Sequence, residues 1–303
     1  TQVSPYHCTG CTAGLAAGPT KALSMDPWSD KEVANWNKFV VQPGKPLAPG
    51  TPINVRTSQL AQPLLEFRGS CPGCTEPVYT KLLTQLYGDH LVIANGIGCS
   101  TVWGGTGYCN PYTTNAEGKG PAWGCSLFED TTEYGLGIAT GYTARRAAYY
   151  QLIVTASKDM RIDQETRHAL NKRKTPWQKT DAEARTIADT LLKLLSRKPE
   201  EYRRKDPSVR KLLMKLRDSS DLLTKRTHWV IGGDGFAYDI GFGGIDHVLA
   251  GTDPIRILVL DNELYANTGG QKSKSTPASA VAKLATLGKV SQKKDLGLYA
   301  LST

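Results

Sequence analysis

Two stretches decide the fold: Trp229-Val-Ile-Gly-Gly-Asp-Gly-Phe-Ala-Tyr238 and Ile255-Arg-Ile-Leu-Val-Leu-Asp-Asn262. Each begins with a short apolar run, which is typical of a buried strand. Residues 236–249 between them fit a helix. A strand, a helix and a second strand in this order predict a βαβ unit, whose parallel strands are covered by helices. We therefore expect an α/β fold with a mainly parallel sheet between two layers of helices.

The segments before this unit fit the same plan. Pro77–Tyr87 has apolar residues at helical spacing and a proline in its first turn, so we expect an amphipathic helix there. His90–Asn95 predicts a short buried strand that ends in a glycine turn. Residues 103–125 are rich in Gly, Trp and Tyr without periodicity, which indicates an ordered functional loop. A long helix is expected from Leu127 to about Ser157.

The first 62 residues predict an irregular connector, because four prolines and two glycines lie between Pro43 and Pro52. The main domain is expected over residues 63–303, with a charged helical insert at residues 157–228. No apolar run approaches the roughly 20 residues needed to span a bilayer, so we expect no membrane span. The chain begins at Thr1 without a signal peptide or a Met, which is compatible with a piece of a longer chain or a processed form.

The net charge of +9 lies in the insert. Residues 157–228 hold 20 Lys and Arg against 11 Asp and Glu, and the rest of the chain is balanced at 17 of each sign. A nucleic-acid-binding surface would combine the basic residues with interleaved aromatic residues or with a known docking motif. Only Trp177 and Tyr202 are present in the insert, so we expect no nucleic-acid partner. Two interpretations remain, a solvated helical insert and a docking surface for an acidic electron carrier.

Gly233-Asp234-Gly235 and Asn262 predict a metal-diphosphate site. Ligands of parallel sheets bind at the carboxyl ends of the strands, where these residues lie. Glycines let backbone amides approach phosphate oxygens, and a helix begins just after them. Mg²⁺ prefers oxygen ligands, which the Asp234 carboxylate, the Asn262 amide and the backbone carbonyl of Leu264 would supply. The triplet alone could equally be an ordinary turn, and the polar loop Asn267–Gln271 could be an ordinary loop.

The seven cysteines do not form a disulfide framework, because their number is odd and their spacing irregular. Cys71 and Cys74 form a CxxC pair, and Cys99 follows the strand at His90–Asn95. Three such thiolates suit an iron–sulfur cluster or zinc, and a dithiol redox pair is the alternative. Cys109 and Cys125 are candidate fourth ligands or small buried hydrophobic residues. Cys8 and Cys11 form a second CxxC pair.

Together these motifs resemble the thiamine diphosphate-binding C-terminal domain of the pyruvate:ferredoxin (flavodoxin) oxidoreductase family. The resemblance covers about residues 63–295, and the motifs that carry it occur in order along the chain. They are 63–74, Ile93-Ala-Asn95, 98–105, Pro111-Tyr-Thr-Thr-Asn115, Gly120-Pro-Ala-Trp-Gly124, Ser126-Leu-Phe-Glu-Asp130, 233–241 and Asn267-Thr-Gly-Gly-Gln271.

The resemblance implies a set of site residues. Cys71, Cys74 and Cys99 would ligate a [4Fe–4S] cluster, Asp234, Asn262 and the Leu264 carbonyl would hold Mg²⁺, and Asn267 would face the substrate as the catalytic residue. The residues expected to contact thiamine diphosphate are Glu76, Cys99, Gly233, Asp234, Gly235, Phe236, Asn262, Leu264, Asn267 and Thr268.

The resemblance also implies an activity, the oxidative decarboxylation of pyruvate with coenzyme A to acetyl-CoA. Electrons would pass through the cluster to ferredoxin or flavodoxin. We expect a homodimer in a reducing compartment, cytoplasm or organelle matrix, where thiolates stay unpaired. The alternatives are a truncated non-catalytic subunit of a larger assembly and an oxidoreductase for another 2-oxoacid.

The sequence departs from the family in several places. Asn262 stands where some members have Thr, and Cys109 and Cys125 where Cys is unusual. Residues 1–20 would be a remnant of a preceding ferredoxin-like domain. The cluster's fourth cysteine would lie beyond Thr303, and the domain that binds the thiamine pyrimidine is not in this sequence. Because the fourth cysteine and the pyrimidine-binding domain would come from elsewhere, we expect the remaining domains of the enzyme to be partners of this chain.

Overall fold

The computed structural model of the chain describes residues 5, 8–18, 22–40, 51–106, 110–174 and 182–303. At its centre is a four-stranded sheet of parallel strands in the order β2-β1-β3-β4. The strands are β1 (Leu91–Asn95), β2 (Ala122–Cys125), β3 (Thr227–Gly232) and β4 (Ile255–Val259). The expectation of a parallel α/β sheet is therefore confirmed, and Trp229 pairs with Ile93 on one side and Arg256 on the other.

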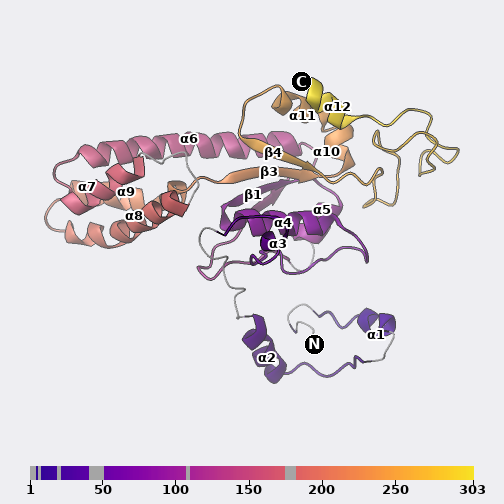
Figure 1. Ribbon diagram of the computed structural model, residues 1–303, viewed down its shortest axis with the longest axis horizontal. Coiled ribbons are helices and arrows are strands. Elements are labelled where there is room, and N and C mark those ends of the chain that lie inside the picture. The colour runs from indigo at the N-terminus through magenta and orange to yellow at the C-terminus, as the bar shows by residue number, and fades with distance from the viewer. Residues whose placement is uncertain (1–4, 6–7, 19–21, 41–50, 107–109, 175–181) are drawn as a thin grey trace.

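Helices cover both faces of this sheet (Figure 1). The face that carries Ile93 and Ile231 packs against α4 (Glu76–Tyr87) through Leu83, and against Leu65 and Trp103 from neighbouring segments. The opposite face, with Ala94 and Val230, packs against α10 (Asp234–Tyr238) and α11 (Phe242–Leu249). Alternate residues of each strand thus enter two separate cores, as a strand buried on both sides requires.

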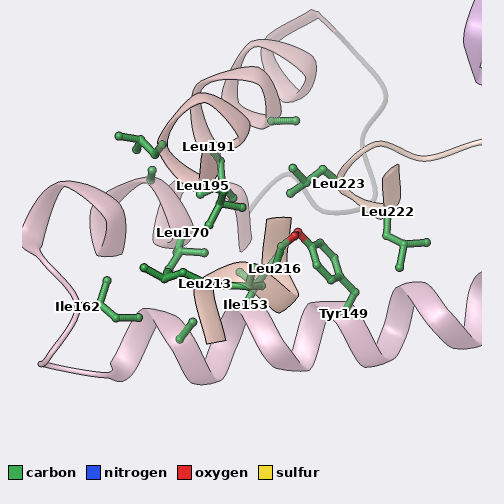
Figure 2. Close-up of a cluster of buried hydrophobic side chains, with 14 of the residues drawn as sticks. Tyr149, Ile153, Ile162, Leu170, Leu191, Leu195, Leu213, Leu216, Leu222 and Leu223 are labelled. Atoms are coloured by element: carbon green, nitrogen blue, oxygen red, sulfur yellow. The ribbon is translucent and has the colours of Figure 1, made fainter. Parts of the chain in front are cut away.

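One long helix joins the sheet to a second, helical core. This helix, α6 (Thr131–Lys158), contacts β1 and β3 with its first half. With its second half it packs on α7 (Gln164–Lys174) and α9 (Pro207–Asp218), and α8 (Ala182–Glu201) lies between these two. Figure 2 shows this helical core, in which Ile153 and Leu195 are fully buried. The predicted insert of amphipathic helices is therefore a packed bundle with its own apolar centre.

The remaining elements are short. They are α1 (Ala13–Ala17), α2 (Asp30–Val40), α3 (Val55–Ser58), α5 (Cys99–Thr101) and α12 (Leu296–Ser302), with 3-10 turns at Gly88–His90 and Ser220–Leu223 and a π-type turn at Val102–Thr106. The first 62 residues hold three of these helices where we expected irregular chain, and α1 buries none of its residues. Within the described residues, no helix is both long and apolar enough to cross a bilayer.

Two local predictions were wrong. The loop at residues 103–125 ends in a strand, β2, which pairs with β1 at the edge of the sheet. The helix expected over residues 236–249 is two helices, separated at Asp239–Gly241. The break is a packing effect, because a Cβ atom on Gly241 would overlap the backbone of Glu129 and Phe236.

Gly135 of α6 offers a test of the contact between this helix and the sheet. A Cβ atom there would lie 2.5 Å from Val230 Cγ2 and 3.1 Å from Ala94 Cβ. Because such overpacking costs about 1–3 kcal/mol, Gly135→Ala should lower the free energy of unfolding by that amount in chemical denaturation. Gly137→Ala is the matched control: its Cβ meets nothing within 4 Å, and alanine should stabilise the helix by about 1 kcal/mol. Equal effects of the two substitutions would contradict the packing.

Candidate functional site

A cavity lies at the carboxyl ends of β1, β3 and β4, where the sequence predicted a ligand site. Its volume is about 110 Å³, which is small against the roughly 300–1,000 Å³ of whole ligand pockets. Each of the three strands contributes the turn that follows it. The predicted residues that line the cavity are Glu76, Cys99, Gly233, Asp234, Gly235, Asn262, Leu264, Asn267 and Thr268.

Asp234 is the central group of this cavity. It lies two residues beyond the end of β3, is 3% exposed, and accepts a hydrogen bond on Oδ2 from the Ser273 hydroxyl at 2.6 Å. Its other carboxylate oxygen, Oδ1, is buried and has no hydrogen-bond partner among the described residues. Burial raises the pKa of Asp234 to about 6, against hydrogen bonds from Ser273 and from the backbone of Asn262, and the neighbouring Asp261 and Asp239 raise it further. A buried carboxylate oxygen without a partner requires a cation or a donor.

Asn262, three residues beyond the end of β4, is oriented by Glu76. Its Nδ2 donates to Glu76 Oε1 at 3.2 Å, while Glu76 Oε2 accepts from Trp103 Nε1 at 3.3 Å. Because the amide nitrogen is engaged in this way, the carbonyl oxygen of Asn262 remains for a ligand. The preceding residue, Asp261, is occupied by hydrogen bonds from Tyr238, at 2.8 Å, and Ser275, and by the ammonium of Lys293 at 2.8 Å.

The oxygen atoms of Asp234 and Asn262 are suitable ligands for a hard cation. The Asp234 carboxylate and the Asn262 amide oxygen belong to the ligand class that Mg²⁺ prefers, and Asp234 Oδ1 is an unpaired oxygen in the cavity wall. The carbonyl of Leu264 already accepts the N–H of Ala266 at 2.9 Å, although a carbonyl has a second lone pair. Asn267 and Thr268 lie on the exposed side of the cavity, where Thr268 donates to Gln271 at 2.6 Å.

Phe236 is the one predicted contact that does not line the cavity. Its side chain is fully buried on the α10–α11 face of the sheet, next to Val230 and Ala237. A hydrogen bond from its backbone N–H opposes the burial that raises the pKa of Glu129. The Phe236 side chain thus lies outside the cavity that the other predicted cofactor contacts line.

Glu129 is the site residue that sequence reasoning missed. It lines the cavity just before α6, with a left-handed φ of 62° that is uncommon outside glycine. Burial raises the pKa of its carboxyl group to about 7, against the hydrogen bond from Phe236, with further contributions from Asp239 and Asp234. A Cβ atom on Gly235 would overlap this carboxylate. The positive φ of Glu129 is a structural signal, whereas the sequence only places Glu129 within the motif Ser126-Leu-Phe-Glu-Asp130.

Cys99, one of the three cysteines of the predicted cluster, lines this cavity. Asn95 at the end of β1 donates to Ser100 at 2.9 Å and to Thr101 at 2.8 Å, which holds the turn that carries Cys99. Burial raises the pKa of the Cys99 thiol to about 11, and the nearby Glu76, Cys74 and Cys71 raise it further.

The thiols are nevertheless not assembled as a metal site. Cys71 is exposed and Cys74 half-buried in a turn, and among the described residues no three Cys, His, Asp or Glu side chains form a metal-binding group. Cys125 lies in β2, Cys8 and Cys11 are exposed, and Cys109 lies outside the described residues.

Comparison with known proteins agrees with this geometry. Residues 214–302, which include Asp234, Asn262 and Asn267, match the family model of the thiamine pyrophosphate enzyme C-terminal TPP binding domain. Residues 214–302 are therefore similar to a thiamine pyrophosphate enzyme C-terminal domain. Within these residues, the turn after β3 and the turn after β4 provide Asp234 and Asn262.

Longer relatives match nearly the whole chain. The pyruvate:ferredoxin oxidoreductase of Moorella thermoacetica is 45% identical over 99% of this chain and 26% of its own length. The pyruvate-flavodoxin oxidoreductase of a Nostoc strain is 42% identical over 99% and 26%. The mitochondrial pyruvate dehydrogenase [NADP(+)] of Euglena gracilis is 43% identical over 99% and 16%. The chain therefore spans about a quarter or less of the length of these relatives.

Among solved structures, a 2-oxoglutarate:ferredoxin oxidoreductase from Magnetococcus marinus aligns with 77% of this chain and 50% of its own. Its sequence identity is 14% and its TM-score 0.39, a likeness too weak to carry an argument.

Proposed function

We propose that this chain holds the diphosphate end of thiamine diphosphate, through Mg²⁺, in a pyruvate:ferredoxin or pyruvate-flavodoxin oxidoreductase. The observation that carries the proposal is the unpaired, buried Oδ1 of Asp234 in a cavity at the carboxyl ends of three parallel strands. When bound, thiamine diphosphate supplies the electron sink for decarboxylation of a 2-oxoacid. The reaction proposed for the whole enzyme is oxidative decarboxylation of pyruvate with coenzyme A, yielding acetyl-CoA and CO₂.

The residues of this chain have separate tasks in that proposal. Asp234, Asn262 and the Leu264 carbonyl would hold Mg²⁺. Glu76 orients Asn262 through the hydrogen bond described above and would itself face the cofactor. Asn267 and Thr268, on the exposed side, would face the substrate and the cofactor. The cavity of about 110 Å³ is suited to a diphosphate group rather than a whole cofactor, which supports a site shared with another domain or a second copy of the chain.

Cys71, Cys74 and Cys99 are proposed as ligands of a [4Fe–4S] cluster that delivers electrons to ferredoxin or flavodoxin. Thiolate sulfur is the usual ligand of such clusters, and the effect of Cys71 and Cys74 on the pKa of Cys99 supports the assignment. Cys71 and Cys74 would have to turn toward Cys99, and a fourth ligand would come from elsewhere. These thiolates also need a reducing compartment, cytosol or organelle matrix.

A reconstitution experiment tests the cluster. In the natural assembly that contains this chain, Cys71→Ser should reduce protein-bound iron by half or more and bleach the broad visible absorption, because serine replaces a thiolate ligand. Cys125→Ser, in β2, is the matched control and should leave iron unchanged. Equal iron in the two variants would remove Cys71 from the ligand set.

The electron carrier is not expected to dock at the far end of the bundle. Helix α6 begins next to Glu129 of the cavity, and its 28 residues span about 42 Å. Arg161, just beyond its other end, lies 3.4 Å from Asp206, so the exposed run Arg203-Arg204-Lys205 is also at that far end. This distance favours the interpretation of the run as a solvated part of the insert.

Turnover measured on the natural assembly tests the whole proposal. Reduction of a viologen dye should require both pyruvate and coenzyme A, and 2-oxoglutarate should not replace pyruvate. Dye reduction with 2-oxoglutarate alone would assign another 2-oxoacid. Binding of thiamine diphosphate without any turnover would instead favour the non-catalytic subunit.

A further inference from the structure

A second cavity lies at the amino ends of the strands, on the sheet edge opposite to Asp234. We call it the amino-edge cavity; it has a volume of about 660 Å³. Thr227 and His228 at the start of β3 line it, together with Ile255 at the start of β4. Because β3 has six residues, the two cavities are separated by about 20 Å of strand. Side chains of α6 and α8 complete the walls of the cavity. Figure 1 shows that the amino ends of β3 and β4 lie on the side of the sheet nearest the helical bundle.

The lining of this cavity is strongly cationic. Five basic side chains line it, and no Asp or Glu does so among the described residues. The five are Arg146 of α6, Arg185 of α8, Lys225 and Arg226 before β3, and Arg256 of β4. An adjoining hollow, which Arg185 and Arg226 also line, holds four acidic residues: Asp89, Glu117, Asp189 and Asp221. Asp89 lies 3.7 Å from His90, and Asp221 lies 4.0 Å from Arg145.

Most of these cations have no carboxylate partner. Within the described part of the chain no carboxylate lies within 4 Å of Arg185, Lys225, Arg226 or Arg256. Arg226 donates to the carbonyl of Asp89, and Arg256 lies 6.0 Å from the Trp229 ring. Four of the five cations around the amino-edge cavity therefore form no ion pair with the described residues.

A buried histidine also faces this hollow. His228 is 6% exposed and packs on the ring of Tyr142 at 5.2 Å between centroids. Neither of its ring nitrogens has a hydrogen-bond partner among the described residues. Burial lowers the pKa of His228 to about 4, and Arg226 lowers it further, so the ring is neutral near pH 7 and offers one donor and one acceptor. Buried polar atoms of this kind are normally paired, which points to a ligand.

We propose that the amino-edge cavity is a second binding site, for a small molecule that carries a diphosphate group. Several cations without an ion pair to the described residues match a multiply charged anion better than a single carboxylate, and guanidinium groups are suited to bidentate contact with phosphate. The volume is that of a small-molecule site. Tyr87 and Tyr142 in the wall provide aromatic surface beside the cations, as a nucleotide base would require.

Calorimetry with inorganic pyrophosphate and with ADP tests this proposal. The titrations use the Asp234→Ala variant of the natural protein in magnesium-free buffer, so that the thiamine site does not contribute and the result is independent of the proposed function. The double variant Arg185→Gln, Arg256→Gln should raise the Kd at least tenfold, because both side chains line the cavity. The control is Arg203→Gln, Arg204→Gln, which removes the same charge from the exposed far end of the bundle and should leave Kd unchanged.

The two ligands distinguish the sources of the diphosphate. Equal affinity for pyrophosphate and ADP assigns the site to the diphosphate group alone, whereas tenfold tighter binding of ADP assigns it to a nucleoside diphosphate. Absence of binding by both ligands would overturn the proposal, and the cavity would then be a contact for an acidic protein segment. Equal loss in the double variant and in the control would overturn it as well, because general surface charge would then explain the binding.

Discussion

Asp234→Ala should abolish Mg²⁺-dependent binding of thiamine diphosphate, with a Kd raised more than a hundredfold in calorimetry. Asp234 is the one carboxylate of the described cavity that combines deep burial with an unpaired oxygen. Loss of a residue that merely supports a metal ligand costs about 10- to 100-fold in affinity, so loss of the charged ligand itself should cost more. Asp234→Asn should bind almost as poorly, because it keeps the shape and the Ser273 contact but removes the negative charge.

Stability measurements separate this effect from unfolding. The raised pKa of Asp234 means that its charged form is disfavoured in the folded protein without a cation. We therefore expect the cofactor-free Asp234→Asn variant to melt at the same temperature as the unsubstituted protein or above it. Asp253→Ala, an exposed carboxylate beyond α11, is the matched control and should bind normally. Retention of tight, Mg²⁺-dependent binding in Asp234→Asn would remove Asp234 from the metal site.

The centre of this fold could be predicted because its signals are local. The apolar runs at Trp229–Ile231 and Ile255–Leu260 define buried strands, and the glycines after the first define the turn that presents Asp234. The edge strand β2 (Ala122–Cys125) carries no such signal, since its four residues Ala-Trp-Gly-Cys neither alternate nor include a β-branched residue. It is a strand because the neighbouring β1 offers hydrogen-bonding groups, which is a tertiary effect.

The positions of Asp234 and Asn262 could be predicted, and the contacts that support them could not. Each residue lies in the turn that follows a strand, so the parallel sheet brings them together. Ser273, by contrast, reaches Asp234 from 39 residues further along an irregular loop, and no periodicity predicts that contact. The basic insert shows the same limit. Its excess charge is evident from composition, but only the folded chain gathers Arg185 of α8 and Arg226, just before β3, around one cavity.

Glu129→Ala should weaken binding of thiamine diphosphate with Mg²⁺ about ten- to hundredfold, which corresponds to the roughly 1–3 kcal/mol that a buried, unsatisfied polar group costs. The Glu129 carboxylate engages the N–H of Phe236, one residue beyond Gly235, and so holds the turn that carries Asp234. Without it, that N–H loses its partner and the turn loses one wall of the cavity. Calorimetry under the conditions used for Asp234 measures the change.

Glu129→Gln distinguishes a positioning role from a charge effect. The amide oxygen of Gln can still accept a hydrogen bond from the Phe236 N–H, and the backbone at position 129 keeps its left-handed φ. Glu129→Gln should therefore keep most of the affinity that Glu129→Ala loses. A role of Glu129 as a negative charge beside the metal would predict the opposite, namely equal losses in Gln and Ala. Glu133→Gln, one turn into α6 and exposed, is the control and should bind normally. Full affinity in Glu129→Ala would show that the glycine turn after β3 keeps its geometry without this contact.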